Sequence, residues 1–485
     1  MATLQIVFST DNNNVFSNKN TNKMLWSYKP DLNFFRTITC GSDLNIIIMG
    51  NNTFKSLTKL LDNRIHYVIS HNTESKSDND QVIYFDTLSE ALIQANKNNA
   101  KISVIGGVQL IYDTLNIAHT IYTKITMYHS IVPLSVESDP DNVYFDFTKV
   151  PHHFILSSKN LGEFFGGCNI HTYTYTHPEY EYLNLIQDIL CDGKLTQNRT
   201  GVNTITKVGC TLRIPLASNV LPVLTTKKVN YNHIVTELLW FLNGDTNSKT
   251  LSTQGVKIWD DNTTREFHAN RINKLVTTYG SERVKDDIKI IEQYNEGDAG
   301  PIYHHQWRHW GAEYVNCDTI YTTGIDQIKR VIEQINIVKN DPLSPEGRRL
   351  IVSAWNVSDL DKMVLNPCHT LFQFHVLDGT LSCTLYQRSG DVGLGIPYNI
   401  TSYALLTHII ATIAGLVPKE LVIFIANAHI YTDHVTQLTM QQTREPMVWP
   451  TLLINKIQDI DNLTENDITV LNYKSHSHIK MKMAV

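Results

Sequence analysis

A change in the spacing of apolar residues near Thr176 limits what this chain can fold into more than any other feature. Before it, short apolar segments alternate with polar connections, and after it the apolar segments become longer. Because 485 residues exceed what one ordinary core accommodates, we expect two domains, residues 1–176 and residues 177–485. No Gly/Ser-rich linker separates them, which predicts closely joined domains.

The first domain alternates predicted strands and helices, as an α/β fold does. Strands are expected at Leu4–Phe8, Asn45–Met49, Ile65–Ser70, Ile102–Ile105 and Thr120–Met127. Helices are expected at Asp31–Thr37 and Leu88–Asn96, and a polar loop at His71–Asp80. This order predicts a central, mostly parallel sheet.

The second domain has longer helices and a strong hairpin signal, which predicts an α+β fold. A helix is expected at Glu179–Leu190, and a long apolar helix at Ile400–Gly415. The predicted strands Leu371–Val376 and Leu381–Gln387 flank Asp378-Gly379, a hairpin turn dipeptide.

Charge and cysteine usage exclude some classes of protein. A net charge of −6 argues against broad nucleic-acid binding, which needs a basic face. The N-terminal residues show no signal-peptide pattern, and the most apolar later stretch, Tyr403–Val417, is too short to cross a bilayer. Seven scattered cysteines lack the close pairing of a zinc site, so we expect no metal, reduced thiols and a cytoplasmic location.

Cys368 is the cysteine whose setting indicates chemistry. It lies in Asn366-Pro367-Cys368-His369, just before the predicted hairpin, and arginines recur nearby at Arg348-Arg349 and Arg388. A guanidinium beside a thiolate favours the charged, nucleophilic form. The alternative is a buried structural thiol.

Other candidate residues also allow a structural explanation. Arg348 and Arg349 precede a predicted strand, Leu350–Ala354, on which neighbouring side chains point to opposite faces, or they form a solvated loop edge. Glu237 lies in a nearly continuous apolar helix, either on a narrow solvent stripe or buried with partners. Asn399 precedes the long helix and could cap it.

Taken in order, these segments resemble thymidylate synthase, from about His177 to Val485. His429 and Tyr431, which otherwise fit a core strand, fall within one of the matching segments. The matching segments are Asn198-Arg-Thr-Gly, Glu237-Leu-Leu-Trp-Phe-Leu, Ile258-Trp-Asp, Gly300-Pro-Ile-Tyr, Gln306-Trp-Arg, Gly347-Arg-Arg, Asn366-Pro-Cys-His, Leu385-Tyr-Gln-Arg-Ser-Gly-Asp, Gly395-Ile-Pro-Tyr-Asn, Ala428-His-Ile-Tyr and the tail Ile479-Lys-Met-Lys-Met-Ala-Val.

The resemblance implies a reaction between dUMP and 5,10-methylenetetrahydrofolate. Cys368 would add to C6 of the pyrimidine, and Glu237 and Tyr303 would manage protons at O4 and C5. Trp259 and Asp391 would face the folate, and the products would be dTMP and dihydrofolate. The resemblance assigns the nucleotide contacts to Arg199, Arg348, Arg349, His369, Gln387, Arg388, Ser389, Asp391, Asn399, His429 and Tyr431.

The resemblance also implies a homodimer, because Arg348 and Arg349 would reach the phosphate bound by the neighbouring subunit. Some positions depart from the family pattern. His304 stands where glycine is usual and would disturb the backbone if positive φ were needed there. Asn427 replaces the usual aspartate, Lys474-Ser475 replaces Asn-Pro, and the stretch Thr264–Asp298 is unusually long.

The N-terminal third resembles dihydrofolate reductase. Trp26, Asp31, Phe34 and Phe35 match the substrate wall, although Asp31 also suits a helix N-cap. The resemblance implies that Asp31 favours protonation of the pteridine at N5, that Phe35 contacts the folate and that Arg64 binds its carboxylate. The residues that it assigns to NADPH are Gly50, Thr53, Ser70, Gly106 and Gly107, with a cis peptide between the last two.

Several features keep alternatives open for each domain. The segment Asn12–Met24 lacks the family's glycines, and Asn51-Asn52 replaces a basic residue, which would suit a non-catalytic reductase-like module. A pyrimidine hydroxymethylase would use the same second scaffold, although Asn399 matches the uracil edge rather than that of cytosine. RNA binding by the second domain would need a basic stripe that the sequence does not show.

Overall fold

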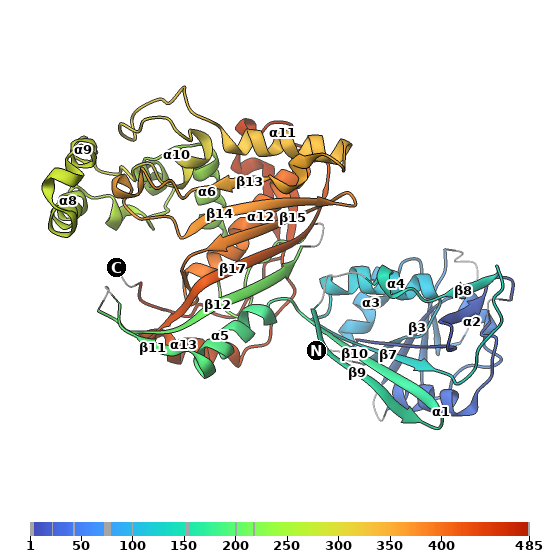
Figure 1. Ribbon diagram of the computed structural model, residues 1–485. Coiled ribbons are helices and arrows are strands. Elements are labelled where there is room, and N and C mark those ends of the chain that lie inside the picture. Colours follow the sequence, from blue (N-terminus) through green and yellow to red (C-terminus); the bar gives the residue numbers. More distant parts are fainter. Residues whose placement is uncertain are drawn as a thin grey trace. The chain divides into compact units, whose positions relative to one another are not determined.

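The computed structural model describes residues 4–21, 23–41, 44–71, 79–98, 100–150, 155–198, 201–216 and 219–483. The chain divides into two compact units, Met1–Tyr180 and Glu181–Val485. Each unit has its own sheet and core (Figure 1).

An eight-stranded sheet forms the centre of the first unit, in the order β5-β4-β3-β6-β1-β7-β10-β9. Six neighbouring strands run parallel, and β10 and β9 continue the sheet antiparallel. Its strands are β1 (Leu4–Thr10), β3 (Asn45–Gly50), β4 (Ile65–Ile69), β5 (Val82–Phe85), β6 (Lys101–Val104), β7 (Lys124–Ile131), β9 (Ile155–Phe165) and β10 (Cys168–Thr176). The mostly parallel sheet confirms the predicted fold class.

Helices and a small two-stranded sheet complete the first unit. The first five of the six residues of β3 are buried, as expected of a parallel strand covered on both faces. The helices are α1 (Lys29–Thr39), α2 (Asn51–Ser56), α3 (Leu88–Lys97) and α4 (Val108–Ile117), and β2 (Val15–Asn18) pairs with β8 (Asn142–Tyr144).

Two sequence predictions for the first unit need correction. The fifth predicted strand begins at Lys124 rather than Thr120, because Ala118–Thr120 forms a 3₁₀ helix. The hairpin of β9 and β10 was not expected. Thr and Tyr make up most of β10, so the segment lacks the run of apolar residues that indicates a strand. Most of the predicted loop at His71–Asp80 lies outside the described residues.

The second unit is built on a sheet in the order β11-β12-β17-β15-β14-β13, with β16 beside β17. Its strands are β11 (Lys194–Thr196), β12 (Thr204–Pro215), β13 (Ile351–Ser353), β14 (His369–Leu377), β15 (Thr380–Gln387), β16 (Gly390–Asp391) and β17 (Val417–Tyr431), and β18 (Thr451–Ile454) pairs with β19 (Ile468–Leu471). The hairpin of β14 and β15 is confirmed, and both turn residues, Asp378 and Gly379, have positive φ (48° and 73°).

The long helix α12 (Gly395–Ala414) packs against β15 and β17 and buries most of its side chains. It begins five residues earlier than predicted, because Pro397 is tolerated in the first turn of a helix. Asn399 therefore lies inside α12, and the prediction that it precedes the helix is wrong. The other helices are α5 (Tyr180–Asp192), α6 (Tyr231–Leu242), α7 (Ser248–Thr253), α8 (Arg265–Tyr279), α9 (Ser281–Ile291), α10 (Tyr303–Arg308), α11 (Gln327–Asn340) and α13 (Val435–Gln442).

The long stretch Thr264–Asp298 folds into α8 and α9, which pack against each other (Figure 1). Their contact has a small apolar core of its own, made by Leu275, Val284, Ile291, Tyr294 and Tyr314. Thr264 caps α8 by accepting a hydrogen bond from the Phe267 backbone N–H.

Candidate functional sites

Cys368 lies immediately before β14 and is partly exposed. Its backbone N–H donates to the Tyr303 hydroxyl oxygen at 2.7 Å, which fixes the loop against α10. Burial raises the pKa of Tyr303 above its usual value, and the neighbouring Cys368 adds to that shift. The phenol therefore keeps its proton beside the sulfur.

Arg388 follows β15 and reaches the same sulfur. The antiparallel pairing of β14 and β15 brings its backbone N–H to the Cys368 carbonyl at 2.9 Å. Its guanidinium donates to Pro367 O (2.9 Å) and Asn366 O (2.7 Å), and Nη2 lies 3.6 Å from Cys368 Sγ. A cation fixed at this distance favours a thiolate, so the geometry supports a nucleophile rather than a purely structural thiol.

Asn399, Gln387 and His369 form a polar group next to Cys368. Gln387 Nε2 donates to Asn399 Oδ1 at 2.9 Å and to Ser389 O at 3.1 Å. Burial lowers the pKa of His369 to about 4, although a hydrogen bond with Asn399 opposes the shift. Gln387 Oε1 and His369 Nδ1 are buried and have no hydrogen-bond partner among the described residues.

Glu237 on α6 meets Trp259, whose indole Nε1–H donates to Glu237 Oε1 at 2.8 Å. Burial raises the pKa of Glu237 to about 7, and the Trp259 hydrogen bond acts in the opposite direction. Glu237 is thus half-buried and has a hydrogen-bond partner, which matches the partnered alternative better than a solvent stripe. It can exchange a proton near neutral pH.

Asp391 and His429 lie side by side on the parallel pair β16 and β17. Asp391 accepts hydrogen bonds from the backbone N–H groups of Gly393 (2.8 Å) and Leu394 (3.3 Å). Burial lowers the pKa of His429, and the negative charge of Asp391 opposes that shift. The rings of His429 and Tyr431 are 5.4 Å apart, centroid to centroid.

The C-terminal tail reaches this region. His434 Nε2 lies 2.7 Å from Lys482 O, and Ile479 is buried. A Cβ atom added at Gly393 would lie 3.1 Å from Met481 Sδ, so the tail packs directly beside Gly393. The tail thus lies beside the segment that follows Asp391.

The remaining predicted arginines do not join this group. Arg199 lies outside the described residues. Arg348 ends a 3₁₀ helix and Arg349 follows it before β13 begins, so both precede the strand, as predicted. The register pairs Ile351 with Gln373, which places Arg349 roughly 20 Å from Cys368 along the sheet. Arg349 is exposed, and its nearest acidic partner is Glu346 at 3.3 Å.

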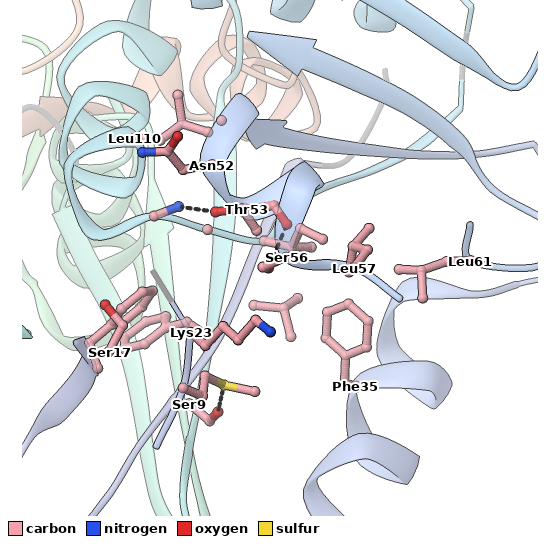
Figure 2. A pocket seen from close by; sticks show the side chains of 18 of the residues that line it. Ser9, Ser17, Lys23, Phe35, Asn52, Thr53, Ser56, Leu57, Leu61 and Leu110 are labelled. Carbon is pink, nitrogen blue, oxygen red and sulfur yellow. Dashed lines mark hydrogen bonds between the residues drawn. The ribbon is translucent and has the colours of Figure 1, made fainter. Parts of the chain in front are cut away.

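The first unit contains a separate cavity of about 1090 Å³, part of which is shown in Figure 2. Its wall includes every residue that the sequence assigned to this unit's site: Asp31, Phe35, Gly50, Thr53, Arg64, Ser70, Gly106 and Gly107. Arg64 comes just before β4, and the others come from α1, from the carboxyl end of β3 and from the segments that follow β3, β4 and β6. The carboxyl ends of neighbouring parallel strands meet at one edge of a sheet, which explains why the residues converge.

Asp31 is the acidic group of the cavity's inner wall. It lies in the first turn of α1 but does not cap it, because Tyr28 occupies the N-cap position. Its side chain is only 5% exposed. Burial raises the pKa of Asp31, and the hydroxyls of Ser130 and Ser9 partly offset that shift.

The glycine pair that follows β6 contacts α2 in the wall of the cavity. Gly107 N–H donates to Thr53 Oγ1 at 3.2 Å (Figure 2), and Gly106 has φ of +154°. Within the described ranges no peptide bond is cis, so the predicted cis bond between Gly106 and Gly107 is wrong. The trans peptide directs the Gly107 N–H toward the Thr53 hydroxyl.

Arg64 lies at another part of the same cavity and is 6% exposed. It donates to Thr39 Oγ1 (3.1 Å) and Asp62 O (3.2 Å), and its guanidinium lies 5.8 Å from the Phe35 ring centroid. Burial lowers the pKa of Arg64, the usual response of a cation that has lost water. A carboxylate entering here would restore the lost charge interaction.

The sequence analysis missed several wall residues. Ser9 and Ser130 are paired across β1 and β7, and Ser9 Oγ donates to Met24 Sδ at 3.4 Å. Figure 2 shows Lys23, Phe35 and Leu57 pointing into one space. A polar residue near the carboxyl end of a parallel strand was the signal that could have identified Ser9.

The described residues show neither a membrane-spanning helix nor a metal site. No helix there combines the length and apolarity needed to cross a membrane. In the same part of the chain, no group of three or more His, Cys, Asp or Glu residues is arranged to hold a metal ion.

Comparisons with known proteins match both units. A family model described as thymidylate synthase matches residues 180–485, and one described as dihydrofolate reductase matches residues 3–133. The bifunctional dihydrofolate reductase-thymidylate synthase of Paramecium tetraurelia is 38% identical over 96% of this chain and 95% of its own length. The protein of the same name from Plasmodium chabaudi is 43% identical over 72% of this chain and 55% of its own. A thymidylate synthase of human herpesvirus 8 is 43% identical over 64% of this chain and 85% of its own.

The Glu237 carboxyl should titrate near pH 7. Changing Trp259 to Phe removes the N–H that stabilises the charged carboxylate, so the pKa of Glu237 should rise. Carboxyl ¹³C NMR of the glutamate-labelled protein, with Glu237→Gln used to assign the signal, measures both values. A Glu237 signal that titrates near pH 4.5, or one that Trp259→Phe leaves unmoved, would contradict this reading of the site.

Proposed function

This chain belongs to the bifunctional dihydrofolate reductase–thymidylate synthase family, and from that premise we propose which of its residues carry out the two reactions. The second unit converts dUMP and methylenetetrahydrofolate to dTMP and dihydrofolate, and the first unit reduces dihydrofolate to tetrahydrofolate. The roles of individual residues, the reductant, the dimer and the compartment are the content of the proposal.

The observation that carries the synthase proposal is the fixed pairing of Cys368 Sγ with the Arg388 guanidinium at 3.6 Å. The thiolate adds to C6 of dUMP, and the electron pair moves through C5 to O4. C5 then attacks the methylene group of the folate as one C–N bond to that carbon breaks. After C5 loses its proton, the second C–N bond breaks and the released tetrahydrofolate delivers a hydride to the methylene carbon. This gives the methyl group and dihydrofolate, and the bond to Cys368 breaks to release dTMP. Arg388 and Ser389 bind the phosphate, and Arg199 contributes to the same contact.

The uracil edge is read by Asn399. Its Oδ1 accepts a hydrogen bond from Gln387, which fixes the orientation of the amide. The Nδ2 hydrogens then point away from Gln387. A lone amide that faces both N3–H and O4 of uracil needs one acceptor and one donor. Gln387 and His369 extend this polar wall with free acceptor and donor atoms. His429 and Tyr431 contact the sugar hydroxyl.

Protons are handled by Glu237 and Tyr303. A carboxyl group that titrates near 7 protonates O4 as C6 is attacked and takes the proton back later. Tyr303, which keeps its phenolic proton, supports removal of the C5 proton through a bound water. Trp259 and Asp391 face the folate, and the C-terminal tail beside Gly393 excludes water from the reacting atoms.

A homodimer completes the synthase site. Alternate side chains of β14 and β15 pack toward α12, and the opposite face of the sheet exposes apolar side chains. These are Ile351, Leu371, Leu377, Tyr386 and Phe424. An apolar sheet face on a globular unit is typical of an isologous interface. Arg348 and Arg349, too far along the sheet to reach their own Cys368, then extend to the partner's phosphate site.

NADPH is the reductant proposed for the first unit, and the cavity fits it. A Cβ atom at Gly50 or Gly107 would meet nothing within 4 Å, so flat groups can approach the backbone there. The N-terminus of α4 lacks a side-chain cap, and its first residues, Val108 and Gln109, line the cavity, which suits a phosphate. NADPH supplies the hydride that reduces dihydrofolate.

Asp31 carries the reductase proposal because its buried carboxyl lines the cavity. It holds the pteridine and favours the proton at N5 that hydride transfer requires. Phe35 packs on the folate and Arg64 binds its carboxylate. The open volume of about 1090 Å³ argues against a remnant whose cleft is filled by side chains. The seven free cysteines fit a reducing, cytoplasmic compartment.

Replacing Cys368 with alanine should lower dTMP formation by on the order of 10⁴-fold or more, because the nucleophile is lost. Binding of dUMP, measured by calorimetry, should remain detectable. Cys191→Ser, a change at an exposed cysteine on α5, is the matched control. Turnover near the unmodified level in Cys368→Ala would contradict the mechanism.

Mixing two inactive variants tests the shared site. Cys368→Ala and the double variant Arg348→Ala/Arg349→Ala should each be nearly inactive alone. After subunit exchange, a mixed dimer holds one site with an intact cysteine and intact partner arginines, so about a quarter of the original synthase activity should return. If the arginines serve their own subunit, no activity returns.

Replacing Asp31 with asparagine should lower dihydrofolate reduction at pH 7 by about 10²-fold or more, since the group that favours N5 protonation is gone. Synthase activity in the same preparation should not change. Asp113→Asn on α4, where the carboxylate bonds only Gln109 among the described residues, is the control. Full reductase activity in Asp31→Asn would remove Asp31 from the mechanism.

A further inference from the structure

His304 is a fully buried histidine (0% exposed) for which the mechanism above has no use. It lies in α10, next to Tyr303, at the position where the family resemblance leads one to expect glycine. The structure does not require glycine here, because His304 has helical backbone rather than positive φ. Its side chain, however, occupies space that glycine would leave empty.

The surroundings of the His304 ring are aromatic. Its centroid lies 4.0 Å from that of the Trp240 ring and 5.2 Å from that of Phe241. Neither ring nitrogen has a hydrogen-bond partner among the described residues. Burial lowers the pKa of His304 far below its usual value, so the ring is neutral. Its contribution is therefore its shape, since it makes no hydrogen bond there.

Two aromatic residues connect His304 to the reacting groups. Trp240 and Phe241 lie on α6 one turn after Glu237, on the same helix face. Trp240 and Phe241 are 5.9 Å and 6.4 Å from Trp259, centroid to centroid. Phe241 is also 5.2 Å from Tyr303. The His304 ring thus extends from α10 and packs against α6. Helix α10 also carries Tyr303, and α6 carries Glu237.

We propose that His304 is a positioning residue of the synthase reaction, whose flat neutral ring holds Trp240 and Phe241 so that Trp259 presents its indole N–H to Glu237. His304 touches no reacting atom and acts only through these rings. The inference rests on the proposed role of Glu237 and adds to it. It also accounts for a bulky buried side chain at this position.

Loss of the ring has a directional consequence. Trp240 and Phe241 would relax into the vacated space, and Trp259 would lose its packing against them. The carboxylate would then lose the donor that stabilises its charged form, so Glu237 should titrate at higher pH. The other titratable groups recorded beside Glu237 are Tyr398 and Tyr403 of α12, whose phenols keep their protons because burial raises the pKa of both.

The test compares three variants. His304→Ala removes the ring but keeps a good helix former, and His304→Phe keeps a ring without the nitrogens. His305→Phe is the matched control, because His305 is equally buried on α10 but packs against Tyr314 and Tyr321, at 5.0 and 4.7 Å. Three readouts are measured: the pH dependence of kcat for dTMP formation, the KM for each substrate, and the ¹³C titration of Glu237.

In His304→Ala the transition in the pH profile of kcat that is assigned to Glu237 should shift to higher pH by about half a unit or more. The shift has the same direction as in Trp259→Phe. The kcat should fall about tenfold at pH 7, and the KM for dUMP should stay the same. In His304→Phe and His305→Phe this transition should stay at the same pH. If His304→Ala does not fold, His304→Leu, which fills the space without a flat ring, should show the same upward shift.

Two outcomes would overturn the inference. One is a Glu237 titration that does not move in the folded His304→Ala or His304→Leu variant. The other is an equal shift in His304→Phe or in His305→Phe, which would assign the effect to the ring nitrogens or to α10 in general. Failure of the proposed function gives a different result. If Glu237 has no role in the reaction, Glu237→Gln leaves the pH dependence of kcat unchanged, while the ¹³C titration of Glu237 still reports the effect of His304.

Discussion

The antiparallel pairing of β14 with β15 is the constraint on which the synthase site depends. It brings the residue before one strand, Cys368, against the residue after the other, Arg388. The guanidinium is held by the backbone carbonyls of Asn366 and Pro367, in the segment that leads into β14, which fixes its position near the sulfur. Asn399 joins through α12, which packs on the same sheet. The residues proposed as the nucleophile, the phosphate-binding cation and the base-reading amide thus share one rigid frame.

Burial also shifts the pKa values of carboxyl groups in both units. Glu237 has one recorded hydrogen-bond donor, Trp259, and little water, which brings its pKa to about 7. In the first unit, Asp31 is shifted in the same direction for the same reason, with two hydroxyls opposing the shift. Each unit therefore holds a carboxyl group whose pKa is raised by burial. The fusion is chemically coherent, because dihydrofolate made by one unit is the substrate of the other.

The sequence predicted well wherever the signal was local. The hairpin around Asp378-Gly379, the parallel strands of the first unit and the convergence of its predicted site residues on one cavity follow from turn dipeptides, apolar runs and family motifs. It failed where tertiary packing decides. Asn399 looked like a helix cap because Pro397 precedes it, yet the helix begins earlier and includes both. The bond between Trp259 and Glu237 and the aromatic packing of His304 join residues far apart in the chain, and no spacing rule reveals them.

The most direct test of the account is the stoichiometry of the complete cycle in the purified full chain. The protein is supplied with dUMP, methylenetetrahydrofolate and NADPH, and dTMP, folates and NADPH are measured by chromatography. Our account predicts one NADPH oxidised for every dTMP formed, with tetrahydrofolate as the folate product and dihydrofolate accumulating only when NADPH is left out. Formation of dTMP with dihydrofolate accumulating and NADPH untouched would contradict the claim that both units are catalytic.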